Sequence, residues 1–161
     1  MFIKCLGREF VITPDGEVST KGHITPWVKI LLLYYIKYGG KGEPSGKWVS
    51  FSDLKAGLIK ATAFKRDCEE PLKDVFDRDF EKASMALMRL GAERRECASF
   101  GFSWNLYLLP KVPVNILYWP KEEEFDSKLK IVFDSTADRF LDSESLVFLG
   151  EGLVKNVEMM M

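Results

Sequence analysis

The residues best suited to chemistry in this chain form one acidic run, Lys121-Glu122-Glu123-Glu124-Phe125-Asp126. The run lies between two segments whose composition predicts strands. Carboxylates held this close repel one another, so one of them can keep a proton at an elevated pKa, or several can share a hard cation such as calcium or magnesium. The competing interpretation is a solvated acidic loop, which is the usual state of a charged run.

Three other motifs fall short of the chemistry that they resemble. The glycine-rich segment 39–47 follows a predicted helix rather than a strand, and Trp48 stands where a phosphate-binding loop has Ser or Thr. The segment 101–105 half matches a nucleophile elbow, yet its alternation places Ser103 inside a strand. Since His23 is the one histidine, no histidine pair can bind a metal, and any triad would depend on this residue. We therefore assign no catalytic residue and no metal site.

The cysteines and the apolar segments indicate a soluble cytoplasmic protein. Cys5, Cys68 and Cys97 are odd in number and widely spaced, with no C-x-x-C pair, so they spell neither a disulfide framework nor a zinc ribbon. The first residues show no signal-peptide pattern. The most apolar stretch, 30–36, is far shorter than the roughly 20 residues that span a bilayer. We expect no membrane partner.

Length and charge narrow the class of protein further. A chain of 161 residues favours a single domain, 1–161, that buries roughly 68–70% of its unfolded surface. The net charge is −1 with 29% charged residues, so the surface is mixed in sign. Such a surface lacks the basic field that nucleic acid binding requires, and we expect no nucleic acid partner.

The first part of the chain predicts a hairpin, a helix and a loop. Residues 2–20 form two strands around the turn Thr13-Pro14-Asp15-Gly16. Thr25 can cap a helix that runs to Tyr38, with Pro26 at its first position. Because this helix is apolar nearly all round, we expect it to be buried centrally. The glycine-rich segment then forms a loop.

The second part alternates between helical and strand periods. One helix opens at Pro71 and ends before Gly91, and its apolar positions recur at steps of three and four: Leu72, Phe76, Phe80, Ala83, Leu87 and Leu90. Period-two alternation then predicts strands over 100–109, 114–119 and 129–133, and a last helix is capped at Asp142 or Ser143. These blocks predict a compact α+β domain, with an N-terminal hairpin and a mainly antiparallel sheet packed against three main helices.

Short motifs recur along the chain in a distinctive order. They are Leu6-Gly7-Arg8-Glu9-Phe10, Pro14-Asp15-Gly16-Glu17-Val18, Lys29 to Ile36, Gly46 to Phe51, Pro71-Leu72, Leu90-Gly91, Pro110-Lys111-Val112-Pro113, Trp119, Glu122 to Phe125 and Ile131 to Asp134. In this order they resemble the domain of unknown function 3786 family, found mostly in anaerobic bacteria and archaea. The resemblance runs over nearly the whole chain, and it implies no established activity.

The chain departs from the pattern of this family in three places. Relatives usually have a helical segment ahead of the first strand, which is absent here. A histidine common in the long apolar helix appears as Tyr34, and the proline that usually follows the acidic motif is Asp126. A neutral phenol is a poor substitute for imidazole, so the change at Tyr34 argues against a shared haem or metal ligand at that position.

The resemblance suggests where a shared site would lie. Polar residues on loops held by rigid strands are where function tends to sit. The acidic run and the ends of the neighbouring strands meet that description, and Trp48 adds an aromatic side chain that can line a pocket. The candidate ligand-binding residues are Trp48, Trp119, Glu123, Glu124, Phe125 and Asp134.

Two hypotheses about function follow. The first is a non-enzymatic binding or accessory module in anaerobic metabolism, which recognises a cofactor, a metal centre or a partner protein. Some relatives are joined to iron–sulfur modules or occur alongside corrinoid metabolism, which suggests an iron–sulfur or corrinoid protein as partner. The second is a small enzyme that uses Glu123, Glu124 or Asp134 for acid–base or divalent-cation chemistry. The residues themselves identify no cofactor.

Overall fold

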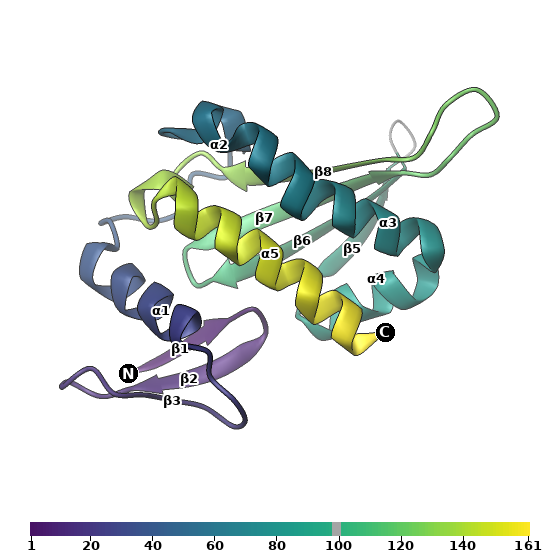
Figure 1. The fold of residues 1–161 in the computed structure, drawn as a ribbon. Helices are drawn as coiled ribbons and strands as arrows, with labels where there is room; N and C mark the ends of the chain where they lie inside the picture. Colours follow the sequence, from purple (N-terminus) through teal and green to yellow (C-terminus); the bar gives the residue numbers. More distant parts are fainter. Residues whose placement is uncertain (98–100) are drawn as a thin grey trace.

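The computed structural model describes residues 1–97 and 101–161 as two sheets and a set of helices (Figure 1). The elements along the chain are β1 (Phe2–Cys5), β2 (Arg8–Ile12), β3 (Val18–Ser19), α1 (Pro26–Tyr38), β4 (Trp48–Ser50), η1 (Phe51–Asp53), α2 (Gly57–Phe64), η2 (Lys65–Glu69), α3 (Glu70–Arg78), α4 (Phe80–Arg89), β5 (Glu93–Cys97), β6 (Gly101–Leu109), β7 (Val112–Trp119), β8 (Lys128–Asp134), η3 (Ala137–Arg139) and α5 (Ser143–Met160). The predicted α+β class is confirmed.

The larger sheet has the strand order β4-β8-β7-β6-β5, and every neighbouring pair is antiparallel. Helices α3, α4 and α5 lie along one face of this sheet (Figure 1). Apolar side chains on that face are fully buried, among them Trp104, Ile116 and Ile131. Burial of each large side chain stabilises the fold by about 1.5–3 kcal/mol, so this layer is the main core.

The predicted N-terminal hairpin is present and is part of a smaller sheet, ordered β1-β2-β3. A second turn, which the sequence analysis did not predict, joins β1 to β2 at Leu6 and Gly7, both of which have positive φ angles. The backbone N–H of Leu6 donates to the carbonyl of Leu108 at 2.9 Å, which ties this small sheet to β6.

The expected central burial of helix 26–38 is wrong. In α1 only Leu31, Leu32 and Tyr35 are buried, while Trp27 is 65% exposed and Ile30 is 58% exposed. The helix lies beside the small sheet at one side of the molecule (Figure 1), so it packs on one flank only. Because α1 is apolar nearly all round but packs on one flank, its other flank is an apolar surface exposed to solvent.

The helix predicted from Pro71 to Leu90 is two helices. Asp79 has an extended backbone, with φ −156° and ψ 90°, and ends α3. Its carboxylate then caps α4 by accepting a hydrogen bond from the N–H of Lys82 at 3.1 Å. At its N-terminal end, α3 continues without a break from η2, a π-helix that itself follows α2.

The predicted strands and the last helix are found, with differences at their ends. The strand expected over 100–109 begins at Gly101 among the described residues, and Phe100 lies outside them. Strand β5, which carries mostly charged residues, was not predicted. Asp142 caps α5 through the N–H of Ser145 at 2.8 Å. Within the described residues, no helix combines the length and hydropathy needed to cross a membrane.

Candidate functional site

Strand β8 separates the predicted site residues into two groups. Trp119 pairs with Lys128 at the start of β8, and Trp48 pairs with Asp134 at its end. At about 3.3 Å per residue, these two ends lie about 20 Å apart. The carboxylates of the acidic run precede β8, so they lie near the Trp119 end. The structure therefore does not bring Asp134 and Trp48 together with the other candidates.

Asp134 anchors the glycine-rich loop. Its carboxylate is fully buried and accepts hydrogen bonds from the N–H and hydroxyl of Ser45, at 3.0 and 3.1 Å, and from the N–H of Gly46, at 2.7 Å. The N–H and hydroxyl of Thr136 donate to it at 3.0 and 2.6 Å. Burial raises the pKa of Asp134, but these hydrogen bonds outweigh burial and lower the pKa to about 2. The carboxylate thus has a structural task.

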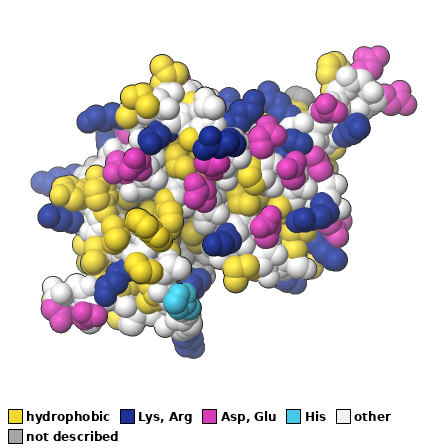
Figure 2. Space-filling model, in the orientation of Figure 1, with side chains coloured by type: hydrophobic (Ala, Val, Ile, Leu, Met, Phe, Trp, Pro, Cys, Tyr) yellow, Lys and Arg dark blue, Asp and Glu magenta, His cyan; other side chains and the backbone are white. Residues whose placement is uncertain are grey.

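The acidic run forms a loop that projects from the end of the sheet between β7 and β8 (Figure 1). Two backbone hydrogen bonds close it: the N–H of Glu122 donates to the carbonyl of Phe125 at 2.9 Å, and the N–H of Phe125 donates to the carbonyl of Glu122 at 3.3 Å. Phe125 is 69% exposed, and Glu123 and Glu124 are exposed too. Figure 2 shows this projection as acidic side chains around a hydrophobic one.

The loop presents its carboxylates to solvent rather than to a common centre. Among the described residues, no three His, Cys, Asp or Glu side chains are arranged so that they could hold a metal ion. Trp119, at the base of the loop, has the Nζ of Lys128 at 5.4 Å from its ring centroid, which is a cation–π arrangement. The geometry thus presents a surface with one exposed aromatic side chain and several carboxylates.

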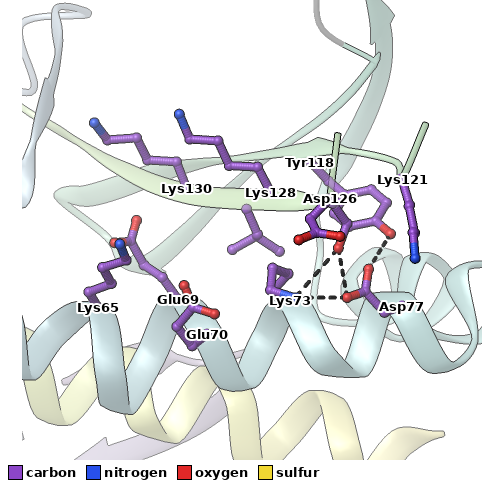
Figure 3. A pocket seen from close by; sticks show the side chains of 12 residues that line it. Lys65, Glu69, Glu70, Lys73, Asp77, Tyr118, Lys121, Asp126, Lys128 and Lys130 are labelled. Atoms are coloured by element: carbon purple, nitrogen blue, oxygen red, sulfur yellow. Dashed lines mark hydrogen bonds and ion pairs between the residues drawn. The ribbon is translucent and has the colours of Figure 1, made fainter. Parts of the chain in front are cut away.

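A groove that the sequence analysis did not predict begins at the base of this loop. It has a volume of about 990 Å³ and runs between the helix η2–α3 and the first half of β8 (Figure 3). Its lining residues are mostly charged: Lys65, Glu69, Glu70, Lys73, Asp77, Tyr118, Lys121, Asp126, Ser127, Lys128, Leu129 and Lys130. Since Lys121 and Asp126 belong to the acidic run, the loop and the groove form one continuous surface.

Asp77 connects the two sides of the groove at one end by hydrogen bonds (Figure 3). Its carboxylate accepts hydrogen bonds from the hydroxyls of Tyr118 and Ser127, both at 2.7 Å, and from the Nζ of Lys73 at 2.9 Å. Partial burial raises the pKa of Asp77, but the hydrogen bonds from Ser127, Lys73 and Tyr118 leave that pKa below its ordinary value. The pKa of Tyr118 is raised by burial and by Asp77, so its phenol stays a proton donor in this network.

Glu69 closes the other end of the groove. Glu69 lies in the π-helix η2, and its Oε2 atom accepts a hydrogen bond from the backbone N–H of Ile131 at 2.8 Å. Burial raises the pKa of Glu69, and the hydrogen bond from Ile131 and the charges of Lys130 and Lys65 offset part of this rise. Single-turn π segments are frequent at functional sites, so this one adds to the interest of the groove.

The sequence holds a signal that could have found this groove. Lys65, Glu69, Lys73 and Asp77 recur at steps of four, which places alternating charges along one face of a helix. Such a face is ordinarily solvated, and here it faces β8 across the groove. Lys128 and Lys130 occupy alternate positions of a predicted strand. Neither pattern alone indicates that the two faces meet.

Comparison with known proteins supports the expected resemblance. A family model described as Domain of unknown function (DUF3786) matches residues 1–156 of the 161-residue chain. The resemblance inferred from the order of motifs is thereby confirmed. Neither the curated proteins nor the solved structures give a match. The description of the family assigns no activity, so the function has to be argued from the geometry.

Proposed function

This chain belongs to the family described as Domain of unknown function (DUF3786), and on that premise we propose that it is a non-enzymatic binding module for a partner protein. The observation that carries the proposal is the presentation of Phe125. Its side chain is 69% exposed at the tip of a loop that two backbone hydrogen bonds close. A preformed loop of this kind loses little conformational entropy on binding.

The base of the loop is held as well. The hydroxyl of Ser127, one residue beyond the acidic run, donates to Asp77 of α3, and Tyr118 of β7 donates to the same carboxylate. Aromatic residues on such surfaces are frequent anchors of protein interfaces, where they enter a pocket of the partner. We place Trp119, Glu123 and Glu124 around Phe125 in this role, and the surrounding carboxylates favour a partner surface that is basic around an apolar pocket.

The cellular setting of this module is part of the same proposal. The resemblance to a family of anaerobic microorganisms suggests a cytoplasmic role in anaerobic metabolism, with an iron–sulfur or corrinoid protein as partner. The enzyme alternative has less support from the geometry. Its candidate carboxylates, Glu123, Glu124 and Asp134, do not form one cluster, because the acidic run and Asp134 flank opposite ends of β8. The hydrogen bonds to Asp134 also keep its carboxylate ionised and engaged.

Native mass spectrometry of protein purified without oxygen from a native-like host tests the proposal, together with an absorption spectrum of each sample. The wild-type protein is compared with Phe125→Ala and with the control Phe2→Ala, whose side chain is 78% exposed on β1. We expect a complex of defined mass with the wild type and with Phe2→Ala, and its loss with Phe125→Ala. Equal retention of the complex by both variants, or no complex with any sample, would contradict the proposal.

A further inference from the structure

Half of strand β8 has an open edge. Strand β7 pairs with β8 from Lys128 to Phe133, on one side. On the other side β4 pairs only with Val132, Phe133 and Asp134. Among residues 1–97 and 101–161, no strand therefore pairs with residues 128–131 on their outer side, which is the side that faces the groove (Figure 3). Unpaired strand edges are templates for pairing with another chain.

The direction of the backbone groups on this edge follows from one hydrogen bond. The N–H of Ile131 points away from β7, because it donates to Glu69 of η2. In an antiparallel ladder the N–H and C=O of one residue point to the same side, and residues two apart repeat that direction. The N–H and C=O of Leu129 thus also face the groove. At Ile131 the carboxylate of Glu69 accepts the hydrogen bond that a neighbouring strand would otherwise accept. The open edge therefore ends at this residue.

Lysines slightly outnumber carboxylates around the edge. Four ammonium groups form no ion pair within the described part of the chain, namely those of Lys65, Lys121, Lys128 and Lys130. Lys73 is paired with Asp77, and the charges of Lys65 and Lys130 act on Glu69. Five lysines and four carboxylates line the groove in all, so the preference for an acidic occupant depends on where the lysines stand.

The placement of the lysines favours an extended chain over a small anion. Lys128 and Lys130 project from the same face of β8, while Lys65 stands on the helix across the groove (Figure 3). These groups do not converge on one point. Their spacing of two residues equals the repeat of a strand, and their partners on β7, Trp119 and Leu117, carry no charge. Acidic side chains on an added strand would meet both lysines as cross-strand pairs.

We propose that the groove binds an extended acidic segment of a partner protein, which adds a strand along the outer edge of β8 with acidic side chains beside Lys128 and Lys130. This inference rests on the proposed function, because it names the part of the partner that is recognised. Hydrogen bonds to the main chain of Leu129 give affinity, and the lysines give the preference for acidic residues. Asp77 links α3 to Tyr118 and Ser127 at the end of the groove near the loop.

Synthetic octapeptides test this inference without knowledge of the partner. One peptide alternates Glu and Val, and the comparison peptide alternates Lys and Val. Binding to isotope-labelled wild-type protein is followed by NMR, with the amide of Leu129 as the reporter of the edge. We expect the acidic peptide to shift and protect this amide and to bind about tenfold more tightly than the basic one. Equal binding of both peptides, or binding that leaves Leu129 unchanged, would overturn the inference.

Methylation of the peptide backbone separates strand addition from simple charge attraction. The acidic peptide is N-methylated at its odd residues in one sample and at its even residues in another. An added strand turns only alternate N–H groups toward β8, so one sample should lose binding and the other should keep it. If the two samples behave alike, no strand is added at this edge.

Charge reversal identifies the side chains involved. The double variant Lys128→Glu with Lys130→Glu should weaken binding of the acidic peptide about tenfold. The control is Lys4→Glu with Lys155→Glu, which reverses two exposed lysines outside the groove, and its affinity should stay within about twofold of the wild type. Equal loss in both double variants contradicts a specific site. Phe125→Ala should still bind the peptide, so a failure of the proposed function can be told from a failure of this inference.

Discussion

The carboxylate of Glu69 and the backbone N–H of Ile131 form a hydrogen bond of 2.8 Å that joins the π-helix η2 to strand β8. A side chain here does what a neighbouring strand would do, because it satisfies a backbone donor on an otherwise open edge. The contact is local, and residues 128–130 line the groove beside it. Glu69 thus occupies one position of this edge, and β4 does not extend over the adjoining ones.

Substitution of Glu69 should reveal the free energy that burial of its charge costs. Because its pKa is raised above the ordinary 4.5, the folded state holds the proton more tightly than the unfolded state. Stability should therefore fall as pH rises from 4.5 through the raised pKa. Glu69→Gln should abolish this part of the pH dependence, which urea unfolding at a series of pH values will measure. An unchanged slope in the variant would contradict the assignment.

Loss of the Asp134 carboxylate should be among the most damaging polar substitutions. In Asp134→Ala the buried donors of Ser45, Gly46 and Thr136 lose their acceptor, and the free energy of unfolding should fall by about 3 kcal/mol. The control is Glu124→Ala, which removes an exposed carboxylate and should change stability by about 0.5 kcal/mol or less. Urea denaturation compares the two variants. A similar small loss in both would show that Asp134 is not an anchor.

Asp134 should also contribute to stability in the opposite pH sense from Glu69. Its pKa is about 2 in the folded protein, below the ordinary 3.8, so the unfolded chain binds more protons between these values. About 2 kcal/mol of stability should be present above pH 4 and should disappear as pH falls from about 4 to 2. Asp134→Asn should lack this acid-dependent loss. A loss of the same size in the variant would assign the effect to other groups.

The hydroxyl of Tyr118 should control the acidity of Asp77. Tyr118→Phe removes one of three hydrogen bonds to this carboxylate, so the pKa of Asp77 should rise toward its ordinary value, and stability should fall by about 1 kcal/mol. NMR titration of the carboxyl carbon measures the pKa. Tyr107→Phe, at a side chain that is 58% exposed, serves as the control and should change neither quantity.

Helix α1 should respond to substitution as a surface helix. Leu32 is fully buried, so Leu32→Ala should cost about 2–5 kcal/mol. Trp27 is larger but 65% exposed, and Trp27→Ala should cost about 1 kcal/mol or less. Thermal or urea unfolding distinguishes the two. A larger loss of stability in Trp27→Ala than in Leu32→Ala would contradict the surface position of this helix and support the central burial predicted from its hydropathy.

The ends of helices could be predicted from the sequence where a single local signal, such as a capping residue, determines them. The caps at Thr25 and Asp142 and the reversal at Gly91 are examples, since each depends on neighbouring residues only. The break at Asp79 escaped prediction because the apolar steps continue across it, from Phe76 to Phe80. Hydropathy of helix 26–38 likewise could not show which flank would be covered.

The candidate site is less predictable because it depends on distant parts of the chain. Asp134 accepts hydrogen bonds from residues 88 and 89 positions away, and no local pattern distinguishes such an anchor from a site residue. Glu69 meets Ile131 across 62 positions. The exposed loop around Phe125, in contrast, was predicted as a loop from its charge and its place between two strands. Whether its residues bind a partner remains a prediction.

Photo-crosslinking from the tip of the loop tests the central claim most directly. Phe125 is replaced by p-benzoylphenylalanine, and Phe2 is replaced in the same way as the exposed control. Both variants are irradiated in an anaerobic native-like host, and their adducts are identified by mass spectrometry. A binding module predicts one defined protein adduct from position 125 and none from position 2. No adduct from position 125, or the same adducts from both positions, would contradict the claim.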